Sequence, residues 1–304
     1  MATVLSSDSD DAIAIHDPYL EVTPSKTSPG RASSSRGRKA TPLLVLHLFS
    51  GRSGREDGLA AYLKAVGIDT EERDIVNVHV TEQDLLDDAV WERLKVRIRN
   101  GEFAFKFSGP PCRTFSASRA HQPGPPVLRC GEHIYGFPKS QRRRGLDPHH
   151  YEQIRCDNLL AERVAEACLL MHEQGLGYAV EQPTPFNGAV TMFSFQSFKT
   201  LIGMGAQMVH FDQCMYGGLT KKPTSVLFGN SEFKSLASRC NHPDELQFRT
   251  DGSTYWAPHP NFVGKKKADG TYATQDLAAY PGKLNCILAT NINASIRNSK
   301  VATS

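Results

Sequence analysis

Residues 108–119 read SGPPCRTFSASR and place a cysteine directly after two prolines. A thiol is a strong nucleophile only as a thiolate, and its unperturbed pKa is about 8.5. The prolines restrict the backbone before Cys112, so the direction of the sulfur is set in advance. Arg113 and Arg119 are near enough in sequence to lower the pKa of this thiol. Most lone cysteines are small core residues, but this context favours a nucleophile.

The glycine turn GRSGREDG, residues 51–58, follows an apolar run and precedes a helical pattern. It is neither G-x-G-x-x-G nor a phosphate loop, so a dinucleotide or a nucleoside triphosphate loses support. S-adenosylmethionine fits better, because its carboxylate can use a helix N-terminus. Asp74 can bind the ribose hydroxyls, and Asp84 and Leu85 can lie beside the adenine. Taken alone, the pattern is better explained by a structural turn with surface acids. The predicted cofactor-binding residues are Phe49, Ser50, Gly51, Gly54, Asp74, Ile75, Asp84, Leu85 and Pro110.

Glu181 is the third chemical candidate, at the end of the strand-like segment YAVEQP. A carboxyl group buried there without a partner is costly. If it faces a pyrimidine, it can hold the ring nitrogen and supply a proton. A surface acid is the alternative.

The elements that must position these residues alternate between strand and helix patterns. This alternation predicts an α/β fold with a parallel sheet and crossover helices. Ligands of such sheets bind at the carboxyl ends of the strands, near a switch in strand order. We therefore expect the glycine turn, Cys112 and Glu181 to converge on one edge. The predicted strands are residues 42–49, 68–75, 102–109, 178–183, 206–213 and 224–230, and the predicted helices are 55–67, 88–101, 158–175, 195–205 and 278–296.

These motifs resemble those of the cytosine-C5 DNA methyltransferase family. LHLFSGRSG is similar to the family's cofactor motif Asp-Leu-Phe-x-Gly-x-Gly, and GPPCRTFSASR matches its Pro-Pro-Cys-x-x-Phe-Ser loop. YAVEQP stands where the family has Glu-Asn-Val, and the order and spacing agree over residues 43 to about 228. The resemblance implies a Rossmann-like S-adenosylmethionine-dependent methyltransferase sheet with crossover helices and a small irregular C-terminal subdomain.

The resemblance also implies a mechanism and a partner. Cys112 would add as a thiolate to C6 of a cytosine, and Glu181 would grip N3 and the amino group. C5 would then take the methyl group from S-adenosylmethionine, and loss of the C5 proton would release the cysteine. The implied partner is double-stranded DNA, whose target base leaves the stack at a cost of roughly a few kcal/mol.

Three departures from the family pattern leave DNA versus RNA open. Gln182 replaces an asparagine, and His47 replaces an aspartate. A motif with two arginines is reduced to Gln213, Lys221 and Lys222, and lysine lacks the planar fork of arginine. We assign Lys222 a role on the substrate oxygen or on a phosphate. The alternatives are cytosine methylation of RNA, a binding protein that has lost catalysis, and a thiol hydrolase that uses Cys112 with His121.

Basic residues follow the predicted nucleophile and suit phosphate contacts that weaken with salt. The predicted nucleic-acid contacts are Arg113, Arg119, Arg142, Arg143 and Arg144. A solvated run of charge is the alternative. Cys130-x-x-His133 and Cys240-x-His242 lack a second pair at zinc-site spacing, so we expect isolated surface residues and no metal.

The composition of the chain also predicts its domain boundaries and its cellular location. Residues 1–41 are rich in Ser, Pro and Gly and predict a disordered tail. We expect a catalytic domain at 42–230, an irregular recognition-like region at 231–280, and a terminal helix with a tail at 281–304. Seven scattered cysteines without a signal sequence predict reduced thiols in an intracellular protein, either nuclear or cytoplasmic. No run of eighteen apolar residues indicates a membrane span.

Overall fold

The computed structural model describes residues 43–51, 54–74, 84–116, 119, 125–139, 146–185, 189–249 and 251–301, which belong to the unit Thr41–Ser304. Several predictions lie outside the described residues: the tail at 1–41, Ile75 of the cofactor site, His121, and the basic residues Arg142, Arg143 and Arg144.

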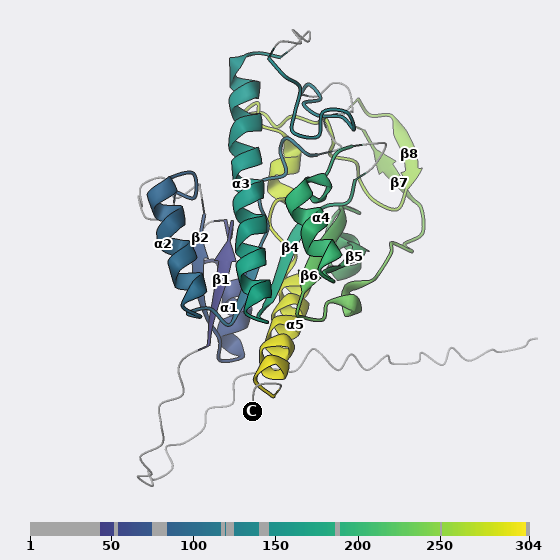
Figure 1. Cartoon of the computed structure of the whole chain (residues 1–304). Coiled ribbons are helices and arrows are strands. Elements are labelled where there is room, and N and C mark those ends of the chain that lie inside the picture. Colours follow the sequence, from purple (N-terminus) through teal and green to yellow (C-terminus); the bar gives the residue numbers. More distant parts are fainter. Residues whose placement is uncertain are drawn as a thin grey trace, which may run out of the picture. The chain divides into compact units, whose positions relative to one another are not determined.

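Six strands form one sheet in the order β2-β1-β3-β4-β6-β5 (Figure 1). Neighbours among β1 to β4 run parallel, whereas β6 runs antiparallel to both β4 and β5. The predicted Rossmann-like α/β fold is confirmed, and β6 is the exception to the parallel arrangement. The strands are β1 (Leu44–Leu48), β2 (Asp69–Arg73), β3 (Phe105–Ser108), β4 (Gly177–Pro183), β5 (Gln207–Asp212) and β6 (Pro223–Gly229).

Five α-helices in the described part of the chain cover the two faces of this sheet (Figure 1). Leu46 and Leu48 of β1 pack in one core with α2, α3 and α4, while Val45 packs in the other with α1 and α5. Successive strand residues point to opposite faces, so one apolar strand serves both cores. The helices are α1 (Leu59–Ala65), α2 (Asp88–Arg99), α3 (Pro148–Glu173), α4 (Gln196–Gly203) and α5 (Gly282–Val301).

The strand order reverses next to β1, because β2 lies on one side of it and β3 on the other. Ligands of doubly wound sheets bind at such a switch point. The Gly109 N–H donates to the Leu48 carbonyl at 3.3 Å, so the segments that leave β1 and β3 lie side by side there. The glycine turn and the Pro-Pro-Cys loop therefore flank the switch point.

Some boundaries differ from the predicted ones. α3 begins at Pro148, well before residue 158, because the Asp147 carboxylate accepts from the His150 N–H at 3.0 Å and proline suits a first helical turn. The last helix begins at Gly282, after Pro281, and extends to Val301.

Residues 231–280, predicted as loops, contain a hairpin of β7 (Glu245–Phe248) and β8 (Thr254–Ala257). Its strands are short and largely exposed, so no buried face produced a clear alternation in the sequence. Short 3-10 helices complete the described elements: η3 (Met192–Ser194), η4 (Gln213–Tyr216), η5 (Lys234–Leu236) and η6 (Ala273–Leu277).

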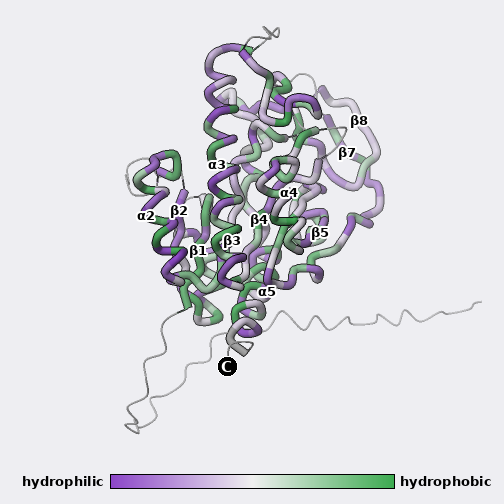
Figure 2. The backbone as a smooth tube through the Cα atoms, viewed as in Figure 1, coloured by the Kyte–Doolittle hydropathy of each residue, from purple (hydrophilic) through white to green (hydrophobic). Residues whose placement is uncertain are grey.

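Hydrophobic and hydrophilic positions alternate along α3, as expected for a helix with one face on a core (Figure 2). Among the described helices, none is both long enough and apolar enough to cross a membrane.

Candidate active site

The turn after β1 is braced by the residue that follows β2. Phe49 and Gly51 have positive φ angles of 63° and 79°, a region that glycine adopts at least cost. The buried Asp74 carboxylate accepts from the Gly51 N–H at 2.5 Å, and the Phe49 N–H donates to the Arg73 carbonyl at 2.6 Å. Asp74, predicted to bind a ribose, thus also fixes the shape of the turn.

This turn is open on its glycine side. A Cβ atom added at Gly51 or Gly54 would meet no atom of the described residues within 4 Å. A ligand can therefore approach the backbone closely, which fits the predicted S-adenosylmethionine. Leu85 differs from expectation, since it is buried in the core with α2 and α3 and does not line an open surface. Asp84 is exposed, and its carboxylate accepts from the Leu86 N–H at 2.9 Å.

The loop that carries Cys112 is anchored to α3 through Asp157. The Thr114 hydroxyl donates to the buried Asp157 carboxylate at 2.7 Å, and the Arg113 guanidinium pairs with the same group at 3.0 Å. The Phe115 N–H donates to the Cys112 carbonyl at 2.9 Å, which closes a tight turn directly after the cysteine. Pro110 is buried, and Cys112 is partly buried. Sequence reasoning missed Asp157, because it lies within an otherwise ordinary amphipathic helix.

Gln182 ties β4 to the same loop. Its side-chain amide donates to the Pro110 carbonyl at 2.7 Å, and its amide oxygen has no hydrogen-bond partner among the described residues. This amide therefore positions the backbone ahead of Cys112.

Glu181 is buried at the end of β4, where Tyr280 binds it. The Tyr280 hydroxyl donates to Glu181 Oε2 at 2.8 Å. A Cβ atom at Gly109 would lie 2.5 Å from the Tyr280 hydroxyl oxygen, so only glycine leaves room for this pair beside the nucleophile loop. Tyr280 was not predicted, because nothing in the local sequence before α5 marks it as part of a site.

Lys222 approaches from the start of β6. Its ammonium donates to the Leu277 carbonyl at 2.7 Å and lies 5.8 Å from the centroid of the Tyr280 ring. Its backbone has a positive φ of 34°, unusual for a residue with a side chain. The structure thus brings Glu181, Lys222 and Tyr280 into contact, and the charges of Glu181 and Lys222 both act on the Cys112 thiol.

These groups shift one another's pKa values. The pKa of the Cys112 thiol is raised to about 11, first by burial and then by Glu181, while Lys222 opposes the shift. Burial also raises the pKa of Glu181, against Lys222 and the hydrogen bond from Tyr280. Cys112 is thus favoured as a thiol, and the raised pKa of Glu181 makes this group easier to protonate. In its protonated form a carboxyl group can donate a hydrogen bond to a ring nitrogen.

The two arginines nearest to Cys112 in sequence bind other groups of the structure. The cation that lowers the pKa of Cys112 is Lys222, while Arg113 pairs with Asp157. Arg119 is buried and donates to the carbonyls of Arg113 and Pro126, so within the described residues it shapes the loop and its guanidinium is not exposed to a phosphate. Arg129 is also buried, where it donates to the Thr114 hydroxyl at 2.9 Å.

The expectation that Cys240 and His242 are isolated is wrong, because both lie in one cluster with Cys214 and His259. Cys130 and His133 instead share backbone hydrogen bonds across a single turn.

No protein-family model matches this chain, and no curated protein matches it. Among solved structures, it is similar to the Entamoeba histolytica methyltransferase EhMeth, with 13% identity and a TM-score of 0.35 over 64% of this chain and 55% of that one. It is also similar to the S. pombe Dnmt2 methyltransferase, with 15% identity and a TM-score of 0.31 over 61% of this chain and 50% of that one. The chain thus spans about half the length of these two proteins.

Proposed function

We propose that this protein transfers a methyl group from S-adenosylmethionine to C5 of cytosine in DNA, through a covalent bond to Cys112. The observation that carries the proposal is the meeting of Cys112, Glu181 and Lys222 at the edge of the sheet that also holds the open glycine turn. This reaction needs a nucleophile, a proton donor and a cation, beside a turn that suits a cofactor without phosphates.

The residues act in a defined order. Cys112 loses its proton to solvent, and the charge of Lys222 stabilises the thiolate. The sulfur then forms a bond to C6 of the cytosine, while Glu181 donates its proton to N3 and C5 gains electron density. The Glu181 carboxylate formed in this step accepts the hydrogen bond from Tyr280. Once C5 has gained the methyl group that S-adenosylmethionine would supply, loss of the C5 proton to a base breaks the bond to sulfur, and N3 returns its proton to Glu181.

The cofactor would be held by the turn after β1. S-adenosylmethionine, when bound, supplies an electrophilic methyl carbon. Gly51 and Gly54 leave the backbone accessible to it, and Asp74 keeps the turn in shape. Phe49 and Ser50 complete the proposed binding residues.

Double-stranded DNA is the proposed substrate, and RNA is the alternative polynucleotide. Arg113 presents a half-exposed guanidinium beside the nucleophile, and we propose phosphate contacts for it and for Arg142, Arg143 and Arg144. A second function, nucleic-acid binding without catalysis, is favoured by the raised pKa of Cys112 and by Gln182, whose amide holds Pro110 instead of orienting Glu181.

Methyl transfer to nucleic acid tests the proposal directly. The full chain, incubated with S-adenosylmethionine carrying a labelled methyl group, should label a cytosine-containing DNA duplex more than tRNA. Cys112→Ser should abolish labelling, while Cys286→Ser, at an exposed cysteine, should leave it unchanged. Labelling of tRNA alone would assign the RNA activity. Binding of DNA without labelling of either polynucleotide would establish the non-catalytic function.

A further inference from the structure

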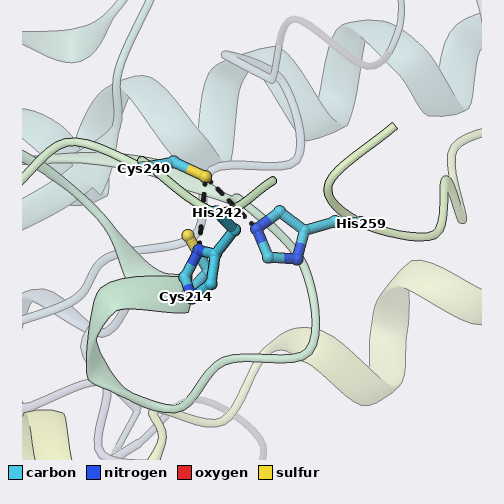
Figure 3. A group of neighbouring side chains, drawn as sticks. All are labelled: Cys214, Cys240, His242 and His259. Atoms are coloured by element: carbon cyan, nitrogen blue, oxygen red, sulfur yellow. Dashed lines mark hydrogen bonds between the residues drawn. The ribbon is translucent and has the colours of Figure 1, made fainter. Parts of the chain in front are cut away.

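Four potential metal ligands from separate segments meet at the end of β5 (Figure 3). Cys214 lies in η4, Cys240 and His242 precede β7, and His259 follows β8. One ligand atom from each residue lies within 4.8 Å of all the others. The reaction proposed above uses none of these four residues.

The distances suit a tetrahedral ion with sulfur and nitrogen ligands. Zinc binds sulfur at about 2.3 Å and imidazole nitrogen at about 2.0–2.1 Å, which separates neighbouring ligand atoms by roughly 3.3–3.8 Å. Cys240 Sγ lies 3.3 Å from His259 Nε2 and 3.5 Å from His242 Nδ1. Two thiolates and two imidazoles are soft and borderline ligands, which favour zinc over magnesium or calcium.

Hydrogen bonds already hold the cysteine ligands in place. The Cys240 N–H donates to the buried Asp212 carboxylate at 2.8 Å, and the Asp212 N–H donates to the Ser238 carbonyl at 2.9 Å. The Tyr216 hydroxyl donates to the Leu236 carbonyl at 2.8 Å. The segment before Cys240 is thereby fixed against β5 and η4, the element that carries the buried Cys214.

The two histidines flank the β7–β8 hairpin. Phe248 and Trp256 are 66% and 69% exposed, and within the described residues neither strand contributes to the two cores. A two-stranded hairpin without a packed face is marginally stable in water. An ion bound by His242 and His259 would close the base of this hairpin and attach it to the end of β5.

We propose that Cys214, Cys240, His242 and His259 bind one zinc ion that anchors the β7–β8 hairpin to the sheet. On binding, each thiol releases its proton to solvent, and two thiolates with two neutral imidazoles balance the charge of Zn²⁺. Protein side chains from three segments fill all four coordination positions, which leaves none for a reacting molecule, as in structural zinc sites. It stands independently of the methyl-transfer proposal.

Zinc content of the purified full chain tests this site. Elemental analysis should find about one zinc per chain, as a closed four-ligand site predicts. Cys240→Ser and His259→Ala should each lose most of it, while Cys130→Ser and Cys286→Ser should retain it. Wild-type protein without zinc, equal zinc in Cys240→Ser, or a disulfide between Cys214 and Cys240 would overturn the proposal.

Cobalt exchange needs no variant and guards against misfolded mutants. Replacement of zinc by Co²⁺ in the wild-type chain should give visible bands of a tetrahedral ion and a sulfur-to-cobalt charge-transfer band. An octahedral spectrum without sulfur ligation would contradict the assignment. Removal of the ion by a chelator should also raise amide hydrogen exchange in β7 and β8, and unchanged exchange would refute the anchoring role.

Discussion

The Tyr280 hydroxyl donates a hydrogen bond to Glu181 at 2.8 Å and so joins the segment before α5 to the end of β4. Both groups are partly or fully buried, and burial raises the pKa of each. The contact lowers the pKa of Glu181 relative to burial alone, because it stabilises the carboxylate. The segment just before the last helix therefore reaches the candidate site, while the helix itself packs in the core.

Replacement of Tyr280 by phenylalanine should slow methyl transfer about fivefold, the effect of a hydrogen bond worth about 1 kcal/mol. The pKa of Glu181 should rise further, so its protonated form should persist to higher pH. The limb of the pH–rate profile that reports the titration of Glu181 should therefore move to higher pH. The rate is measured against pH, with Tyr135→Phe on the surface as control. An unchanged profile would separate Tyr280 from the reaction.

Loss of the Lys222 charge should make Cys112 less reactive. Lys222 lowers a pKa that burial raises to about 11, so Lys222→Met should raise that pKa and reduce the thiolate fraction at pH 8 several-fold. The rate of alkylation of Cys112, followed by mass spectrometry against pH, measures the change. Lys222→Arg should retain most of the reactivity. Lys234→Met should have no effect, because this exposed lysine pairs with the exposed Glu232. Faster alkylation in Lys222→Met would show that the assigned sign is wrong.

Asp157→Asn should destabilise the protein by about 1–3 kcal/mol, because buried hydrogen bonds from Thr114 and Arg113 lose their charged acceptor. The exposed pair of Glu152 with Arg155 offers the matched control, since Glu152→Gln should change stability much less than Asp157→Asn. Urea unfolding of the two variants gives the comparison. Similar losses in both would show that Asp157 does not hold the nucleophile loop.

How far the sequence predicts this molecule depends on whether a feature is local. Apolar runs such as residues 42–49 predict buried strands, and topology then places Cys112 near Glu181 without knowledge of any side-chain contact. Tyr280 and Asp157 escape prediction, because each acts through a hydrogen bond to a residue far away in sequence.

The Cys and His cluster shows the same limit. Cys214 and His259 join Cys240 and His242 only after β5 and the β7–β8 hairpin have folded. Spacing rules for metal sites describe ligands on one small motif, so ligands that come from three distant segments pass unnoticed.

Acid should weaken the fold through His47. Burial lowers the pKa of His47 from 6.5 to about 4, so protonation favours the unfolded chain as pH falls below 6.5. Linkage makes this worth about 2 kcal/mol at pH 5, a loss that His47→Leu should remove. Unfolding free energies of both proteins at pH 7 and pH 5 give the comparison. An equal loss of stability in wild type and variant would assign the acid sensitivity to other groups.

Trapping with 5-fluorocytosine tests the central claim most directly. Fluorine replaces the hydrogen at C5, so no C5 proton can be lost and the bond to sulfur persists. A DNA duplex that carries this base should form, with S-adenosylmethionine present, a denaturation-resistant adduct whose peptide map places the nucleotide on Cys112. The account predicts that adduct in wild type and in Cys286→Ser and its absence in Cys112→Ser. A nucleotide attached to a different residue, or no adduct from a well-folded protein that binds the duplex, would contradict it.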